Sequence, residues 1–208
     1  LKVPVIHNFR TKDIINHGQG APLMPIVDNW IFNDLKENVI TLNIGGISNI
    51  TIINKDKKIS GFDTGPGMSL SDLYCLRFLS QKYDVNGTMA LNGNIDINLV
   101  NKWIHDEKFI LDSPPKSADK SLFGEEWLDK NINNFDSHEN NLANLAYFTS
   151  LSISLNVKAN DKSKNTSIYV SGGGIKNKAI MTNLSELLPK FKILSIAKKG
   201  IDPKYKEA

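Results

Sequence analysis

The chain has 208 residues, of which 40% are hydrophobic and 23% are charged, and its formal net charge at pH 7 is +3. This length accommodates one full hydrophobic core, or about one and a half lobes of a two-lobed protein. The basic residues are scattered and are not interleaved with aromatic residues, which argues against nucleic acid as a partner. No apolar run reaches membrane-spanning length, so we expect no membrane partner either.

Apolar alternation and glycine turns predict three strands in succession, followed by helices that alternate with strands. The expected strands are Val39–Ile44, Ser48–Ile53, Ile59–Asp63, Ser167–Val170 and Phe191–Ile196. The expected helices are Leu70–Tyr83, Ile95–Asp106, Gly124–Asn131, Asn140–Lys158 and Lys178–Leu188. Pro114 and Pro115 predict a loop over residues 112–121. Antiparallel hairpins followed by βαβ units predict an α/β fold with a mixed sheet and helices on its faces.

The first of three glycine turns has the sequence Asn-Ile-Gly-Gly-Ile-Ser-Asn and occupies residues 43–49, between two expected strands. The Gly45-Gly46 pair predicts a tight hairpin. The backbone amides of such a turn can also form a cradle for phosphate. Taken by itself, this turn favours the plain hairpin over the phosphate site.

The second glycine turn, at residues 61–67, places Asp63 at the end of an expected strand. Gly65 and Gly67 allow the backbone to bend or to approach a ligand closely, and Pro66 suits the first position of a helix. A carboxylate at a strand end can cap the following helix or can serve as a catalytic or ligand-binding group. The two neighbouring glycine turns favour the functional role.

The third glycine turn, Gly172-Gly173-Gly174, follows a β-branched strand and precedes an amphipathic helix. Free amides at a helix N-terminus and the helix dipole favour anions, so this turn is a candidate nucleotide site. It lacks the spacing of a dinucleotide fingerprint and of a P-loop. A sharp turn without a ligand is an equal alternative when the turn is considered alone.

The remaining candidate groups carry weaker signals. Cys75 is the only cysteine, so no internal disulfide forms, which fits a reducing cytoplasm. The four histidines lack metal-ligand spacing. A Mg²⁺ role is conceivable for Asp72, but we expect this residue to be a carboxylate on a helix surface.

The order of the three turns, NIGGISNI, GFDTGPG and SGGGIKN, resembles the sugar-kinase, Hsp70 and actin superfamily. More narrowly, the chain is similar to the anhydro-N-acetylmuramic acid kinase family. Further matching segments lie at Asn8-Phe9-Arg10, at residues 18–25 (GQGAPLMP), at residues 83–93 and at residues 115–128, which begin with Pro-Lys-Ser. The match covers nearly the whole chain, and the combination is more specific than any single turn.

The resemblance implies a ribonuclease-H-like mixed sheet of the kind found in actin-like ATPase lobes. It implies that residues 1–35 are the remnant of a first lobe with a sugar-side segment. Residues 36–208 would form the second, nucleotide-binding lobe, which stops before a closing C-terminal helix. One lobe cannot enclose the γ-phosphate, so we expect this chain by itself to be inactive or nearly so. A homodimer is also compatible with the resemblance.

The resemblance further implies a kinase that uses ATP and Mg²⁺ to convert 1,6-anhydro-N-acetylmuramic acid into N-acetylmuramic acid 6-phosphate, with hydrolytic ring opening, in peptidoglycan recycling. Asp63 would be the general base that activates water. The residues implied in nucleotide and phosphate binding are Asn43, Gly45, Gly46, Asn49, Gly65, Gly67, Gly172, Gly173, Gly174 and Asn177. The residues implied on the sugar side are Arg10, Gln19, Gly20, Ala21 and Pro22.

Several positions depart from the family pattern. Asn8 replaces an Asp, Met68 replaces an Asn, and His17 replaces a Gly. Residues 118–121, Ala-Asp-Lys-Ser, replace Thr-Gly-Arg-Glu, so that Lys120 stands for an Arg and a planar guanidinium is lost. Asn8, Met68 and Lys120 favour the alternative that the chain is a degenerate nucleotide-binding module without catalysis. The intact Asp63 argues against that alternative. A chaperone-like or structural member of the superfamily is disfavoured by the PKS and GQGAPL segments.

Overall fold

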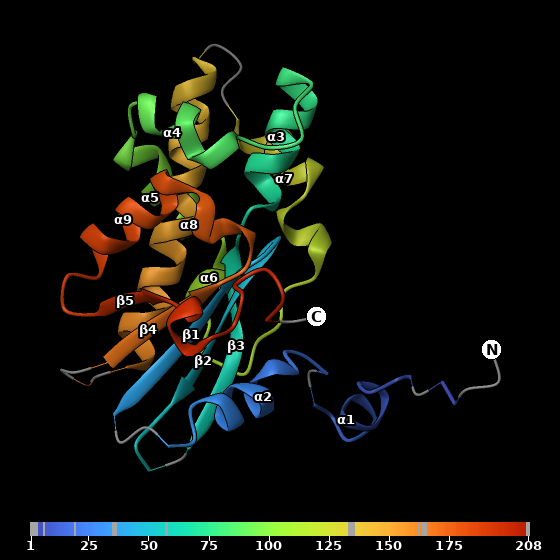
Figure 1. The fold of residues 1–208 in the computed structure, drawn as a ribbon. Coiled ribbons are helices and arrows are strands. Elements are labelled where there is room, and N and C mark those ends of the chain that lie inside the picture. The colour runs from blue at the N-terminus through green and yellow to red at the C-terminus, as the bar shows by residue number, and fades with distance from the viewer. Residues whose placement is uncertain are drawn as a thin grey trace.

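The computed structural model describes residues 4–5, 7–18, 20–34, 37–56, 58–132, 136–161, 163 and 166–206. Its sheet has five strands in the order β3-β2-β1-β4-β5. The strands are β1 (Asn38–Ile44), β2 (Ile47–Ile53), β3 (Ile59–Pro66), β4 (Thr166–Ser171) and β5 (Lys192–Ser195). β1, β2 and β3 are antiparallel, whereas β4 runs parallel to β1 and to β5 (Figure 1). This order and these directions are ribonuclease-H-like, so the predicted fold class is confirmed.

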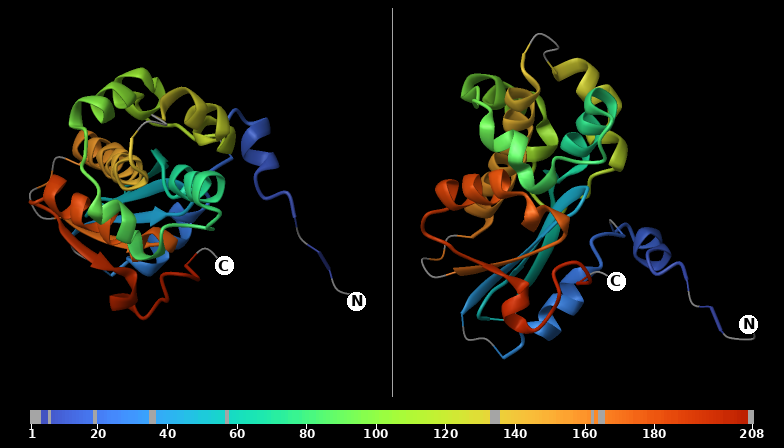
Figure 2. Two further views of the ribbon diagram at one scale, coloured as in Figure 1. Left: turned by 90° about the horizontal axis from the view of Figure 1, so that it is seen from above. Right: turned by 45° about the horizontal axis from the view of Figure 1, so that its top comes forward.

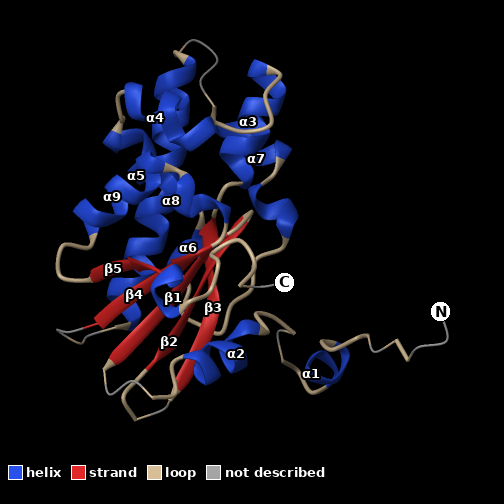
Figure 3. Cartoon of the chain, in the orientation of Figure 1, coloured by secondary structure: helices blue, strands red, loops and turns tan. Residues whose placement is uncertain are grey.

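Most helices lie on one side of the sheet, and α2 lies on the other (Figures 2 and 3). The helices are α1 (Thr11–Ile15), α2 (Met24–Ile31), α3 (Ser69–Leu79), α4 (Thr88–Asn92), α5 (Ile97–Asp106), α6 (Lys108–Leu111), α7 (Glu125–Asn131), α8 (His138–Asn160) and α9 (Lys178–Leu187). Four 3₁₀ turns are η1 (Val85–Gly87), η2 (Lys120–Phe123), η3 (Gly173–Lys176) and η4 (Ile196–Lys199). Among the described residues, no helix combines the length and apolar character needed to cross a bilayer.

All ten predicted elements are present, but two boundaries differ by several residues. The third strand continues past Asp63 to Pro66, so the prediction of Pro66 at a helix start is wrong. Pro66 pairs with Ile47 at the edge of the sheet, where a residue without an N–H is tolerated. Helix α3 ends at Leu79, before the predicted Tyr83, because Ser80 takes a left-handed conformation with φ 54°.

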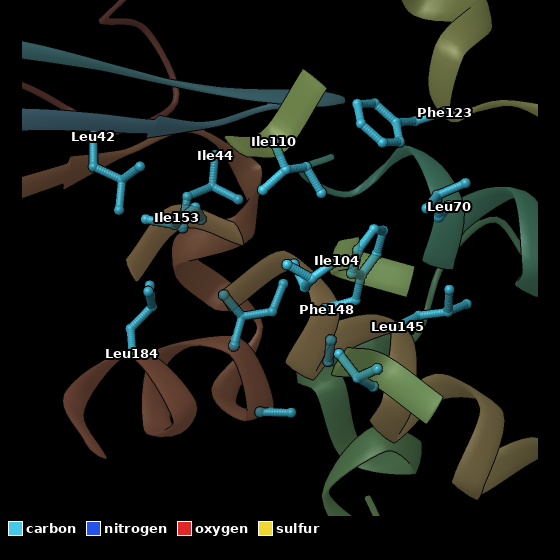
Figure 4. Close-up of a cluster of buried hydrophobic side chains, with 14 of the residues drawn as sticks. Leu42, Ile44, Leu70, Ile104, Ile110, Phe123, Leu145, Phe148, Ile153 and Leu184 are labelled. Carbon is cyan, nitrogen blue, oxygen red and sulfur yellow. The ribbon is translucent and has the colours of Figure 1, made fainter. Parts of the chain in front are cut away.

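The main core lies between the sheet and α8, around the apolar side chains drawn in Figure 4. α8 is buried along most of its length because it packs against the sheet, α4, α5 and α9. Phe148 of α8 is fully buried, stacks on Trp127 at 5.0 Å between ring centroids and meets the edge of Trp103 at 5.6 Å. These aromatic contacts fix α5 and α7 on α8.

Helix α2 buries a charged residue and exposes apolar ones, which is the opposite of an ordinary amphipathic helix. Its one buried residue is Asp28, which accepts hydrogen bonds from Thr41 and Thr51 of the sheet, at 2.6 and 2.8 Å. Lys206 near the C-terminus reaches the same carboxylate at 2.9 Å, and both side chains are at most 1% exposed. The ion pair therefore ties the C-terminal segment to α2 across the sheet face.

We expect Lys206→Met to lower the free energy of unfolding by about 3 kcal/mol, because it leaves the Asp28 carboxylate buried without its cation. Adding Asp28→Asn to that variant removes the orphaned charge, so the double variant should be more stable than the sum of the two single losses predicts. Urea unfolding of the four proteins measures this coupling. Strictly additive losses would show that the pair contributes no interaction energy.

Asp72 in the first turn of α3 is partly buried, and its Oδ1 has no hydrogen-bond partner among the described residues. Burial raises the pKa of this carboxyl from 3.8 to about 6. Between these two pH values the folded protein binds more protons than the unfolded chain, so stability falls as the pH rises. Above about pH 6 the Asp72 charge therefore destabilises the fold.

The variant Asp72→Asn should be more stable than the parent protein at about pH 7.5, by roughly 1–2 kcal/mol once partial exposure is allowed for. At about pH 3.5 the two proteins should differ little, because the parent carboxyl is then mostly protonated in both states. Thermal unfolding at both pH values checks this. An equal gain at both would assign the effect to packing and not to ionisation.

Candidate functional site

The strand end that carries Asp63 is held in place by polar side chains of α8. Thr64 O accepts hydrogen bonds from Ser152 Oγ at 2.6 Å and from Asn156 Nδ2 at 3.2 Å. Thr149 Oγ1 donates to Gly67 O at 2.9 Å. β3 is an edge strand, and these bonds satisfy carbonyl groups that the sheet leaves free. The backbone on the C-terminal side of Asp63 is therefore firmly positioned.

Asp63 is 7% exposed, and among the described residues its carboxylate accepts hydrogen bonds through one oxygen only. Oδ2 accepts hydrogen bonds from the backbone N–H of Ala118 at 2.8 Å and from Ser117 Oγ at 3.1 Å. Oδ1 accepts no hydrogen bond from the residues that the structure describes. The backbone N–H of Asp63 donates to Lys116 O at 3.1 Å, so the same segment holds both backbone and side chain.

Burial raises the pKa of Asp63 above its ordinary value of 3.8. The hydrogen bonds from Ala118 and Ser117 and the charges of Arg10 and Lys116 oppose this shift and limit it. A carboxylate with a raised pKa and one free oxygen can accept a proton from a water molecule. Asp63 thus has the chemistry of a general base.

A pocket of about 540 Å³ opens beside Asp63. It is lined by Arg10, Ala21, Pro22, Leu23, Met24, Ile47, Asn49, Asp63, Ser117, Ala118 and Asp119. It brings together three of the predicted sugar-side residues, Arg10, Ala21 and Pro22, with the predicted base. Asn49, which we predicted on the phosphate side, lies opposite Asp63 across β2 and β3 and lines this same pocket.

Two other predicted sugar-side positions differ from these. Gly20 is buried with φ +67°, and its N–H donates to Asp13 Oδ2 at 2.6 Å, so the structure itself requires glycine there. Gln19 lies outside the described residues. The roles of both in sugar binding stay predictions.

Four of the predicted phosphate-side glycines are required by packing. Gly65 and Gly172 have φ of +141° and +84°, which disfavours a side chain. A Cβ on Gly67 would collide with the carbonyl oxygen of Gly45, and one on Gly174 would collide with the side chain of Ile44. The second and third glycine turns therefore both pack against the first, at residues 44–46.

Gly46 and Gly173 differ from those four glycines. A Cβ at either position would meet nothing within 4 Å, and neither residue has a positive φ. The chain alone therefore gives no steric reason for glycine at these two places. Open space in front of a backbone turn leaves room for the close approach of a phosphate group. Gly45 is intermediate, since its Cβ would make ordinary contacts at 3.5 Å.

The two predicted asparagines on this side serve structural bonds. Asn177 is the N-cap of α9, and its Oδ1 accepts the N–H of Ile180 at 3.1 Å. Asn43 Oδ1 accepts from Ser171 Oγ at 3.3 Å and so joins β1 to β4. Their roles in nucleotide binding stay predictions.

Sequence reasoning missed the residues that hold the base. Pro115-Lys116-Ser117 was noted only as a matching segment, and Ala118 only as a departure from the family pattern. The signal that could have found them is a conformationally restricted proline pair followed by a lysine and a hydroxyl residue, yet no local pattern indicates their distance from Asp63. Among the described residues no group of three His, Cys, Asp or Glu side chains could hold a metal ion.

The chain matches the family model described as anhydro-N-acetylmuramic acid kinase over residues 1–208. Curated relatives with that name include those of Sulfurimonas denitrificans, 37% identical over all of this chain, and Shewanella pealeana, 37% identical over 99% of it. The Vibrio parahaemolyticus relative is 34% identical over 99%. The chain spans only 56–57% of the length of these relatives.

Among solved structures, the activator of 2-hydroxyisocaproyl-CoA dehydratase from Clostridium difficile with bound ADPNP aligns with 79% of this chain. The alignment covers 56% of that structure, with a TM-score of 0.49 and 12% sequence identity. The full-length match to the family model and the 34–37% identity to the relatives are the stronger findings. This chain belongs to the anhydro-N-acetylmuramic acid kinase family.

Proposed function

We propose that this chain is the base-bearing, nucleotide-binding part of a kinase that phosphorylates 1,6-anhydro-N-acetylmuramic acid with ATP. The product is N-acetylmuramic acid 6-phosphate, and the reaction belongs to peptidoglycan recycling in the cytoplasm. Family membership supports the reaction class. The observation that carries the proposal is the Asp63 carboxylate, held through Oδ2 beside a pocket of about 540 Å³, with Oδ1 bonded to none of the residues that the structure describes.

Asp63 acts as the general base in this proposal. A water oxygen attacks the anomeric carbon of the sugar while one of its protons passes to Asp63. The bond between that carbon and O6 breaks, and the electron pair stays on O6. O6 forms a bond to the γ-phosphorus, and the bond from that phosphorus to the bridging oxygen of ADP breaks. Little covalent chemistry remains for other side chains, so positioning dominates the transfer step.

Arg10 is the proposed cation on the sugar side of the pocket. It lines the pocket and is close enough to Asp63 to lower the pKa of that carboxyl. The lactyl carboxylate of a muramic acid sugar would complement its charge. Helix α1 extends away from the sheet (Figure 2).

The nucleotide phosphates belong, in this proposal, at the open face of Gly46 and Gly173. When bound, ATP supplies the phosphoryl group. The described residues offer no cluster of three metal ligands, so we assign no residue of this chain to Mg²⁺. A Mg²⁺ ion in kinases is usually held largely by phosphate oxygens and water.

This chain alone should turn over little or no substrate, because one lobe does not enclose the γ-phosphate. The kinase activity is therefore proposed for a full-length protein, meaning one that also contains the part of the curated relatives that this chain does not span. We expect Asp63→Asn in that protein to lower kcat by roughly 10²–10⁴-fold, since the base is lost. ADP release coupled to appearance of the sugar 6-phosphate measures it.

Asp119→Asn is the matched control for this prediction. Asp119 lines the same pocket, but its Oδ1 is bonded to Ser121 N and Oγ, both at 2.8 Å. We expect less than about a threefold loss there. If Asp63→Asn retained full turnover, Asp63 would not be the base. If the parent bound ATP without phosphorylating the sugar, the degenerate nucleotide-binding alternative would be favoured.

The glycine positions give a second test, which needs only binding. Gly46→Ala and Gly173→Ala should leave the melting temperature nearly unchanged, because the added methyl group meets open space. Both should weaken ATP binding by about tenfold or more, because the methyl group occupies the space proposed for phosphate. Calorimetric titration with ATP measures the affinity.

Gly67→Ala and Gly174→Ala provide the contrast. Their methyl groups would collide with Gly45 O and with the Ile44 side chain, so both variants should melt at lower temperature. Unchanged ATP affinity in Gly46→Ala and Gly173→Ala would place the nucleotide elsewhere.

A further inference from the structure

Lys116 is a buried lysine whose charge has no carboxylate within ion-pair distance among the described residues. Its side chain and backbone are 6% exposed. Nζ donates to Phe109 O and Ile110 O, both at 2.8 Å, and lies 5.0 Å from the centre of the Phe109 ring. These carbonyls are at the end of α6, where a cation is favoured. An ammonium buried in this way is costly to maintain for stability alone.

The contacts of Lys116 lead directly to the candidate base. Its carbonyl oxygen accepts the N–H of Asp63, and the next two residues, Ser117 and Ala118, donate to Asp63 Oδ2. Anchoring the lysine side chain on α6 therefore fixes the three-residue segment that grips the carboxylate. Among the described residues, the Ser117 hydroxyl donates to Asp63 and has no comparable anchor of its own.

The Ile110 carbonyl, which anchors Lys116, also helps to hold the backbone next to Asp63. Ile110 O accepts a second hydrogen bond, from Asn156 Nδ2 at 3.1 Å. Asn156 Nδ2 also donates to Thr64 O, next to Asp63. The Ile110 carbonyl is therefore bonded to both supports of Asp63. Lys116 belongs to the segment that holds the carboxylate, and Asn156 holds the neighbouring backbone.

We propose that Lys116 is a positioning residue for Asp63. Its anchored side chain keeps Ser117 and Ala118 on Oδ2, which leaves Oδ1 directed to water in the pocket. The catalytic consequence rests on the proposed function, whereas the positioning itself does not. The charged and titratable groups that act on Asp63 are Arg10 and Lys116, and Asp119 lines the same pocket. Asp112 is the other carboxyl that acts on Lys116.

The test is the pKa of the Asp63 carboxyl in Lys116→Met, measured by ¹³C NMR and assigned with Asp63→Asn. Lys116→Met removes a nearby cation and loosens the hydrogen bonds from Ser117 and Ala118. Both effects lower this pKa in the parent, so the pKa should rise by about one unit or more. Hydrogen exchange of the Ala118 amide should accelerate by about tenfold or more. Lys116→Arg, which keeps charge and donors, should restore part of both values.

Lys108→Met is the matched control, because Lys108 is an exposed lysine on α6, the short helix whose carbonyl groups accept hydrogen bonds from Lys116. In Lys108→Met, the pKa of Asp63 and the hydrogen-exchange rate of the Ala118 amide should equal those of the parent. If Lys116→Met also matched the parent in both readouts, the proposal would be overturned. Should Lys116→Met not fold, Lys116→Gln, a neutral amide, supports or overturns the proposal through the same two readouts.

Kinetics of the full-length protein separate this proposal from the proposed function. If Lys116 positions the base, Lys116→Met lowers kcat about tenfold or more and changes KM for the sugar little. A shifted Asp63 pKa in a protein that phosphorylates no sugar would uphold the positioning and reject the kinase. If the protein is an active kinase and Lys116→Met leaves the Asp63 pKa unshifted, the proposed function is upheld and the positioning is rejected.

Discussion

The candidate site depends on how the end of an edge strand is held. Past Asp63, β3 has no further strand on its outer side. The carbonyl groups of Thr64 in β3 and of Gly67 just after it accept hydrogen bonds from α8 instead. α8 carries Ser, Thr and Asn where a buried helix would otherwise carry apolar residues, and the hydrogen bonds of these side chains fix the end of the strand. Asp63 is thereby fixed on a rigid element and not on a loop.

The first glycine turn divides the site into two sides. The Asp63 pocket lies on one side, and the turn at Gly172–Gly174 packs against Ile44 on the other. The glycines of the three turns differ in their surroundings. Gly65, Gly67, Gly172 and Gly174 allow the three turns to pack together, whereas Gly46 and Gly173 leave backbone uncovered.

The C-terminal segment links these two sides from the opposite face of the sheet. Pro203 O accepts the N–H of Gly172, and Lys206 pairs with Asp28 of α2. α2 follows directly on Ala21 and Pro22, which line the pocket. Its outward face is apolar, with Ile26 62% and Trp30 72% exposed. The chain spans 57% of the length of a relative such as that of Sulfurimonas denitrificans.

The sequence by itself determined the fold class and the ten main elements, because alternation, periodicity and glycine turns are local signals. Only the tertiary structure decided that β3 passes Asp63, that Asn49 lies opposite Asp63, and that Ser117 and Ala118 donate to the Asp63 carboxylate. Asp63 and Ala118 are 55 positions apart in the sequence. No local propensity encodes such a pairing, because it arises when strand, loop and α6 are packed against α8.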